Sequence, residues 1–299
     1  MTTQTREQWL EERRGGIGGS DCAVVCGVSP WKSAYELYLE KRGEGPEQED
    51  NESMYWGRAL EPVVRQRYAD EMGLTVTVPT AIMWHHEYPW MYCNPDGLTA
   101  ERMMKIKTAR FPAGWGEPGT DEIPEYYVLQ CQHNMIVTGH PVADVPVLIG
   151  GSDFRIYEVQ ADPELQALII RRESEFWEKV LAGEPPEPTT YKDMQLRFGK
   201  HSEPVTVQAN EDAKGALFIL KGVKEKEKEL KALKEVNQAI VMGCMGAAEA
   251  LLEGDATVCT WKLDRPGKRF VVETLKKKHP EIYAECMEDK KPTRRFLPK

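Results

Sequence analysis

The order of the elements expected between residues 103 and 183 constrains the fold more than any other feature of this sequence. A short apolar segment, MMKIKTA, precedes a helical pattern in EYYVLQCQHNMIVTG. Two further segments, VPVLIGG and DFRIYEV, are typical of paired strands, and a second helix follows. Asp162 is the expected N-cap of that helix, Pro163 its first residue, and Gly183 ends it. Strands that alternate with helices predict an α/β architecture.

Local signals place further elements before this region. Ser33 and Glu36 form a capping box at the start of a helix that Gly43 closes. A longer helical pattern ends at Gly73, and the alternating segment LTVTV (74–78) predicts a strand. The first part of the chain therefore adds helices to the α/β arrangement.

The last third of the chain has a different character. After the linker EPPEPTTY, residues 210–250 have helical spacing, and ATVCTWKLD and KRFVVE resemble two short strands. We expect two parts: residues 1–205 as an α/β core, and residues 206–299 as a helical arm with a small β element.

Composition excludes several classes of protein. The net charge of -9 argues against nonspecific coating of nucleic acid, although a groove can still collect cations. No apolar stretch approaches the ~18 residues that span a bilayer, and the first residues lack the apolar core of an export signal. Seven cysteines without a CxxC pair favour a reduced cytoplasm.

The segment NPDGLTAERMMKIKT (94–108) contains part of a nuclease pattern. Metal-dependent hydrolysis of a phosphodiester uses an aspartate, followed on one strand by Asp/Glu-x-Lys. The period of two in a strand puts that acid and that lysine on the same face. Asp96 and Lys107 fill two of the three places, and Lys105 fills the third. A turn followed by a strand with solvated lysines would explain the same residues.

Six ordered segments favour the nuclease interpretation: RRGGIGGSD, GVSPWKSAYELYLEKRG, WGRALEPVVRQRY, HHEYPWMYCNPDG, IKTA and IPEYYVLQCQHNMIVTG. Together, over about residues 8–185, they resemble the YqaJ viral recombinase family, the phage exonucleases related to lambda exonuclease. The resemblance implies a restriction-endonuclease-like core with a mixed central sheet flanked by helices. It also implies a 5′→3′ double-strand DNA exonuclease that depends on Mg²⁺ or Mn²⁺ and acts in the host bacterial cytoplasm.

The resemblance also implies roles for individual residues at the metal. Asp96 would bind the metal, with Glu61 as a second acidic contributor and the backbone carbonyl of Ile106 as a further ligand. Lys107 would be the catalytic lysine. Without the resemblance, Glu61 could equally be a surface acid that pairs with Arg65 at i,i+4.

Further roles follow from the same resemblance. Gln132 matches the superfamily's glutamine, and Gln130 is the other candidate because the register of that segment is open. Arg13 and Ser20 match positions that hold the 5′-phosphate, and Asn94 could donate a hydrogen bond. A solvated helix end and a plain turn would also explain Arg13 and GGIGGS.

The implied partners are double-stranded DNA ends, a single-strand annealing protein and further copies of the chain in a ring-shaped trimer, with no membrane. A structural or partner-docking role of the arm from residue 210 onward is an alternative from a different class.

Lys105 departs from the family pattern, which has E-I-K where this chain has K-I-K. Like charges about 4 Å apart repel by about 4 kcal/mol at a surface-like dielectric. Because tenfold in affinity is about 1.4 kcal/mol, metal binding should fall by orders of magnitude. Three explanations stay open: a version inactivated to trap a substrate complex, a natural DNA-end-binding protein without catalysis, or a lysine that swings out while other groups hold the metal.

Overall fold

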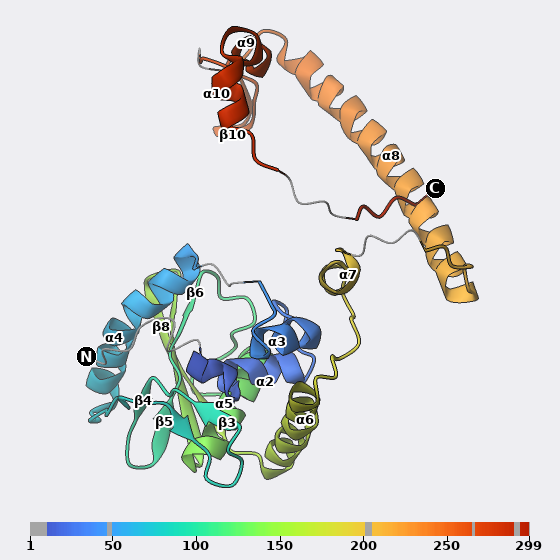
Figure 1. Ribbon diagram of the computed structural model, residues 1–299. Coiled ribbons are helices and arrows are strands. Elements are labelled where there is room, and N and C mark those ends of the chain that lie inside the picture. Colours follow the sequence, from blue (N-terminus) through green and yellow to red (C-terminus); the bar gives the residue numbers. More distant parts are fainter. Residues whose placement is uncertain (1–10, 47–49, 201–204, 265–266, 290–293, 299) are drawn as a thin grey trace. The chain divides into compact units, whose positions relative to one another are not determined.

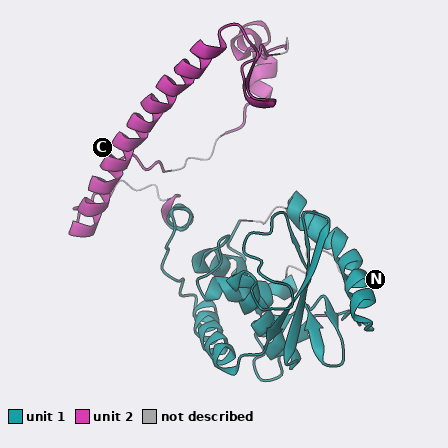
Figure 2. Ribbon diagram, turned by 180° about the vertical axis from the view of Figure 1, so that it is seen from behind, with its two compact units in different colours: residues 1–197 teal, residues 198–299 magenta. Residues whose placement is uncertain are grey.

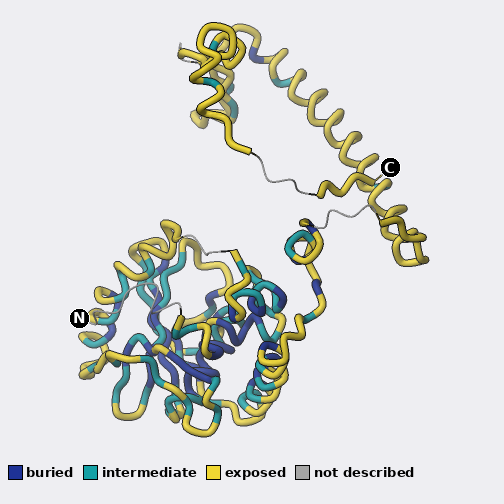
Figure 3. Tube along the Cα trace, in the orientation of Figure 1, coloured by how far each residue is buried: buried dark blue, intermediate teal, exposed yellow. Residues whose placement is uncertain are grey.

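The computed structural model describes the chain apart from residues 1–10, 47–49, 201–204, 265–266, 290–293 and 299. Its contacts divide the chain into two compact units, Met1–Arg197 and Phe198–Lys299 (Figure 2). Buried positions gather in the first unit (Figure 3). Among the described residues, Met245 is the one buried hydrophobic side chain of the second unit. The first unit therefore contains the hydrophobic core on which a precise site can be built.

A five-stranded mixed sheet forms the centre of the first unit (Figure 1). Its central strand, β7 (Val142–Ile149), pairs antiparallel along its whole length with β8 (Asp153–Gln160). Its other edge pairs in parallel with β5 (Arg102–Met104) and β6 (Lys107–Ala109), and β5 pairs antiparallel with β4 (Gly97–Leu98). The expected strand pair VPVLIGG and DFRIYEV is confirmed.

The segment MMKIKTA, which was expected to be one strand, contributes to two short strands, β5 and β6. Both pair with β7 at the same offset. Arg102 faces Val142 and Lys107 faces Val147, so the offset to β7 is the same before and after the interruption. The interruption lies opposite Pro146, which has no N–H to donate to a neighbouring strand. A proline 40 residues along the chain thus breaks the ladder at the point where the expected site residues lie.

Helices cover both faces of this sheet. On one face, Val64 and Tyr68 of α4 (Glu52–Met72) pack against Met104 and Ile106. On the other face, Cys131 and Met135 of α5 (Glu125–Thr138) pack against residues of β7. The expected class, a mixed sheet flanked by helices, is confirmed.

A second, three-stranded sheet lies beside α5. Its order is β1 (Ile17–Gly18), β3 (Met91–Cys93) and β2 (Met83–Trp84), with β1 parallel to β3. α2 (Gly19–Val25) follows β1 directly and contacts α5, and α3 (Ala34–Lys41) and α6 (Pro163–Ala182) complete this side. α7 (Tyr191–Phe198) follows the linker.

Two helix caps expected from the sequence are confirmed, and one expected strand is not. The Ser33–Glu36 capping box begins α3 and the Asp162 side chain caps α6. The segment 74–78 forms no strand, and a single bridge joins Thr77 to Leu98. That prediction was wrong because the rest of the segment has no pairing partner.

The described part of the second unit contains one long helix, a small β element and two short helices. α8 (Glu211–Met245) begins at the Asn210 cap, and β9 (Ala250–Glu253) pairs antiparallel with β10 (Ala256–Thr260). KRFVVE was expected to be a strand, but it leads into α9 (Val272–Lys278), which α10 (Pro280–Glu285) follows. No helix in the described part of the chain is both long enough and apolar enough to cross a bilayer.

Candidate functional site

A cleft of about 1160 Å³ opens in the first unit where α2, α4, α5 and β6 meet. Five basic and three acidic side chains line it, in a chain whose net charge is -9. It therefore concentrates positive charge locally. Nine of the residues that the sequence singled out line this cleft: Arg13, Ser20, Glu61, Asn94, Asp96, Lys105, Ile106, Lys107 and Gln130.

The Lys105 side chain forms an ion pair with Asp96 in the cleft. Its Nζ lies 2.7 Å from Asp96 Oδ1 and 3.1 Å from the Asn94 carbonyl oxygen, and its side chain is only 15% exposed. Burial acts to lower the pKa of Lys105, but the charge of Asp96 and their hydrogen bond outweigh it and raise that pKa. In this structure, Lys105 does not swing away from the site.

These residues do not fit a divalent cation. Both carboxylate oxygens of Asp96 accept hydrogen bonds, Oδ1 from Lys105 and Oδ2 from the Ile106 amide at 2.7 Å. Mg²⁺ needs oxygen ligands in octahedral geometry, and the ammonium group here stands against the carboxylate that would supply one. A cation could reach Asp96 only by displacing Lys105.

Glu61 also has a cationic partner. Arg65, one turn later on α4, forms an ion pair with Glu61 and donates to the Asp96 carbonyl oxygen at 2.7 Å. Burial and the charge of Asp96 raise the pKa of the Glu61 carboxyl, which Arg65 opposes. The i,i+4 ion pair weighed from sequence is thus present, at the wall of the cleft.

Lys107 also lines the cleft and contacts α5. Its Nζ donates to Gln130 Oε1 at 2.6 Å and lies 4.2 Å from the centre of the Tyr127 ring. Burial and the nearby charge of Lys105 lower the pKa of Lys107 to about 8. Lys107 therefore loses its proton at about pH 8, whereas Lys105, its neighbour in the cleft, keeps its proton to much higher pH.

Lys105→Ala is expected to raise the pKa of Lys107, because it removes the positive charge that disfavours its protonation while Asp96 remains. ¹³C-methylated lysines followed by NMR report this directly. Lys107 should titrate near 8 in the unsubstituted chain and closer to the ordinary ~10.4 in the variant. A pKa near the ordinary value in the unsubstituted chain would contradict the burial described here.

The expected position of Gln132 is corrected. Residues two apart on a helix lie about 200° apart around its axis, so only one glutamine can face the cleft. Gln130 does; Gln132 is buried on the other side, where its Nε2 donates to the Gln160 carbonyl at 2.7 Å and its Oε1 accepts from the Asp162 amide at 3.0 Å. Gln132 connects α5 to the start of α6.

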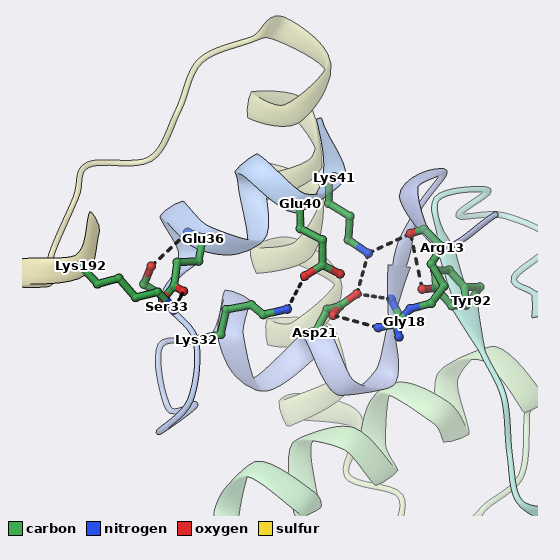
Figure 4. A network of polar contacts seen from close by, with 10 residues as sticks. All are labelled: Arg13, Gly18, Asp21, Lys32, Ser33, Glu36, Glu40, Lys41, Tyr92 and Lys192. Carbon is green, nitrogen blue, oxygen red and sulfur yellow. Dashed lines mark hydrogen bonds and ion pairs between the residues drawn. The ribbon is translucent and has the colours of Figure 1, made fainter. Parts of the chain in front are cut away.

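A buried ionic network supports the wall that carries Arg13 (Figure 4). Asp21 accepts from Lys41 Nζ at 2.7 Å and from the Gly18 amide at 3.1 Å, and Arg13 Nη2 lies 3.8 Å away. Lys41 also donates to the Arg13 carbonyl at 2.9 Å. Burial would raise the pKa of Asp21, but the charges of Lys41 and Arg13 hold it well below its ordinary value.

No local signal in the sequence marks Lys41 and Asp21, the two central members of this network. Lys41 lies in the last turn of α3, where a lysine normally faces solvent, yet its side chain is 1% exposed. Asp21 resembles an ordinary acid in the first turn of a helix. Their pairing depends on contact between two helices, which no local pattern encodes.

Gly19 allows α2 to approach α5 closely. A Cβ at residue 19 would lie 2.1 Å from Asn134 Oδ1, so no larger residue fits without displacing the buried Asn134 side chain. Ser20 follows it and lines the cleft. At this position, the glycine run GGIGGS is required for packing.

The comparisons with known proteins agree with these observations. The model of the YqaJ-like viral recombinase domain matches residues 8–141. The uncharacterized protein YqaJ of Bacillus subtilis (strain 168) is 31% identical over 299 residues, which is 95% of this chain and 92% of that protein. The chain therefore belongs to the YqaJ-like viral recombinase family, and the resemblance recognised in its sequence is confirmed.

Two solved structures are also similar. LHK-Exo, an alkaline exonuclease from Laribacter hongkongensis, is 24% identical with a TM-score of 0.48, over 60% of this chain and 94% of that one. A phage-related exonuclease from Haemophilus somnus 129PT is 15% identical with a TM-score of 0.45, over 56% and 96%.

Proposed function

We propose that this chain binds the ends of double-stranded DNA in the cleft of its first unit, and that Lys105 suppresses the metal-dependent 5′→3′ exonuclease reaction that the family resemblance implies. One observation carries the proposal: the Lys105 ammonium lies 2.7 Å from Asp96 Oδ1, within a cleft lined by more basic than acidic side chains. Phosphate binding benefits from that added cation, whereas a divalent cation is repelled by it.

The cleft offers a site for a terminal phosphate. Arg13 lines it together with Ser20, and its guanidinium is positioned by the ion pair with Asp21 and by a hydrogen bond with the Tyr92 side chain. An arginine fork binds phosphate oxygens in a charge-assisted geometry, and a serine hydroxyl donates a further hydrogen bond. We assign the 5′-phosphate to these two side chains, with Asn94, which lines the same cleft, as a further hydrogen-bond donor.

A residual exonuclease is the second candidate. Asp96, Glu61, Lys107 and Gln130 line the same cleft, which is the set that the nuclease pattern requires apart from residue 105. In this case, Mg²⁺ or Mn²⁺ would support slow cleavage after displacement of Lys105. Cleavage that depends on an added divalent cation distinguishes this candidate from pure end binding.

Two further proposals concern the roles of the two parts of the chain and its oligomeric state. We propose that residues 1–205 act as the nuclease-type part and that residues 206–299 are the arm through which other proteins, such as an annealing protein, are bound. We also propose a ring-shaped trimer, because a ring places the few basic side chains on an inner wall and leaves acidic surface outside.

Arg13→Ala is expected to weaken binding of 5′-phosphorylated duplex ends by about tenfold or more, since a hydrogen bond to a charged group contributes about 1.5–3 kcal/mol. Binding of 5′-hydroxyl ends should change much less. Fluorescence anisotropy with blunt duplexes in EDTA measures both without cleavage.

Arg14→Ala is the matched control. Arg14 is adjacent and equally charged, but it pairs with Glu11 at 2.9 Å and is 44% exposed. It should leave both affinities nearly unchanged. Equal losses on both kinds of end for Arg13→Ala would remove Arg13 from the phosphate site, and no binding of either duplex by the unsubstituted chain would overturn the proposed function.

A further inference from the structure

Three buried side chains with metal-binding atoms meet between α2, α5 and α6, apart from the cleft. They are Cys22 on α2, His133 on α5 and Glu173 on α6, and all three are 0% exposed. One ligand atom from each lies within 4.8 Å of the other two. None of the three lines the cleft described above.

The hydrogen bonds of His133 leave one ring nitrogen directed at this cluster. Its Nε2 lies 2.8 Å from the Tyr92 carbonyl oxygen, which can only accept, so Nε2 carries a proton. Its Nδ1 lies 2.8 Å from Glu173 Oε1. A histidine that ligates a metal commonly donates its other N–H to a backbone carbonyl in this way.

The Glu173 carboxylate is incompletely satisfied. Its second oxygen, Oε2, is buried and has no hydrogen-bond partner among the described residues. The surroundings are apolar, with Ala23, Met91, Leu129 and Ile169 packed around Cys22. A buried carboxylate oxygen without a partner is costly in such a place.

Cys26 adds a fourth donor at the surface side of the cluster. It follows α2 one turn after Cys22 and is only partly buried. Its exposure gives an ion a route to donors that are otherwise enclosed.

We propose that Cys22, Cys26, His133 and Glu173 form a binding site for one zinc ion. Zn²⁺ prefers thiolate, imidazole and carboxylate ligands in tetrahedral geometry, which needs donors roughly 3.5 Å apart. The ligand atoms of Cys22, His133 and Glu173 lie within 4.8 Å of one another, so shifts of about an ångström bring these three to that spacing.

Anionic ligands favour this occupant in an apolar interior. Binding releases the protons of Cys22 and Cys26 and any proton held between His133 and Glu173, so that two thiolates and one carboxylate surround Zn²⁺ and leave one net negative charge. The neutral His133 imidazole completes the tetrahedron. The ion would join α2, α5 and α6 behind the wall that carries Ser20 and Gln130, and so stabilise the cleft.

The full-length chain, purified without a metal-binding tag and dialysed, is the material for the test. We expect about one zinc per chain by mass spectrometry, and a thiolate-to-metal charge-transfer band when Co²⁺ replaces zinc. Cys22→Ser should weaken Zn²⁺ affinity by at least the 10–100-fold typical for loss of a supporting partner, and Cys26→Ser should weaken it by a similar factor.

Two controls separate this site from other donors. Cys244→Ser alters an exposed cysteine of α8, and Asp96→Asn alters the cleft; both should retain zinc and the Co²⁺ band. Less than a tenth of a zinc per chain together with no Co²⁺ band overturns the proposal. If Cys22→Ser does not fold, parental Zn²⁺ affinity in Cys26→Ser, which changes only the partly exposed ligand, overturns the four-ligand site.

Discussion

Lys105→Glu is expected to give this chain Mg²⁺-dependent cleavage of linear duplex DNA. The substitution removes the ammonium group from Asp96 and supplies a carboxylate on the face that Lys107 shares. Relief of a repulsion of about 4 kcal/mol corresponds to roughly 10³-fold in metal affinity. Nucleotide release from a linear duplex measures cleavage, and the rise in melting temperature on addition of Mg²⁺ measures metal binding independently.

Lys105→Gln is the matched control for that experiment. It removes the positive charge without adding a carboxylate, so it should bind Mg²⁺ far less tightly than Lys105→Glu. Asp96→Asn in the Lys105→Glu background should abolish the gain while leaving the fold intact. If the unsubstituted chain already cleaves as fast as Lys105→Glu, the present account of residue 105 is wrong.

Lys41→Met is expected to lower the free energy of unfolding of the first unit by about 3–5 kcal/mol, because it leaves the Asp21 carboxylate buried without its closest cation. Urea unfolding at neutral pH measures the loss. The pKa of Asp21 is held below its ordinary value in the folded state. Its contribution is therefore complete above the unfolded pKa of about 3.9 and disappears as the pH falls through the folded value.

Two further variants define the cause of that loss. Lys192→Met breaks the ion pair with Glu36 at the edge of the same region (Figure 4), where the lysine is 62% exposed, and should cost at most about 1 kcal/mol. Lys41→Met combined with Asp21→Asn removes both charges and should recover much of the stability. A loss for Lys41→Met no larger than for Lys192→Met would show that the buried pair is not a main support of this wall.

The elements with signals inside their own sequence could be predicted. Asp162, Pro163 and Gly183 define α6 by capping, by the fixed φ of proline and by a left-handed terminal glycine at φ 74°. The Ser33–Glu36 box defines α3 for the same reason. In these cases, the groups that satisfy the helix ends lie within four residues of them.

Features that depend on a distant partner could not be predicted. The break before Lys107 follows from Pro146 in the adjacent strand, and the choice of Gln130 over Gln132 follows from what α5 packs against. The sequence indicated that Lys105 would conflict with a metal, but not that it would contact Asp96. That contact depends on the chain turning between Asp96 and Ile106, which brings the two side chains together.

The common register of β5 and β6 limits how this site can change over evolution. Because one offset to β7 serves both strands, an insertion or deletion of one residue between them would reverse which side chains face the cleft. A deletion of residue 105, for example, would bring Ile106 and Thr108 to the places that Lys105 and Lys107 now hold. A point substitution can therefore change the side chain at residue 105, whereas an insertion or deletion beside it would change which residue faces the cleft. Loss or recovery of an acidic side chain at this position needs no rearrangement of the backbone.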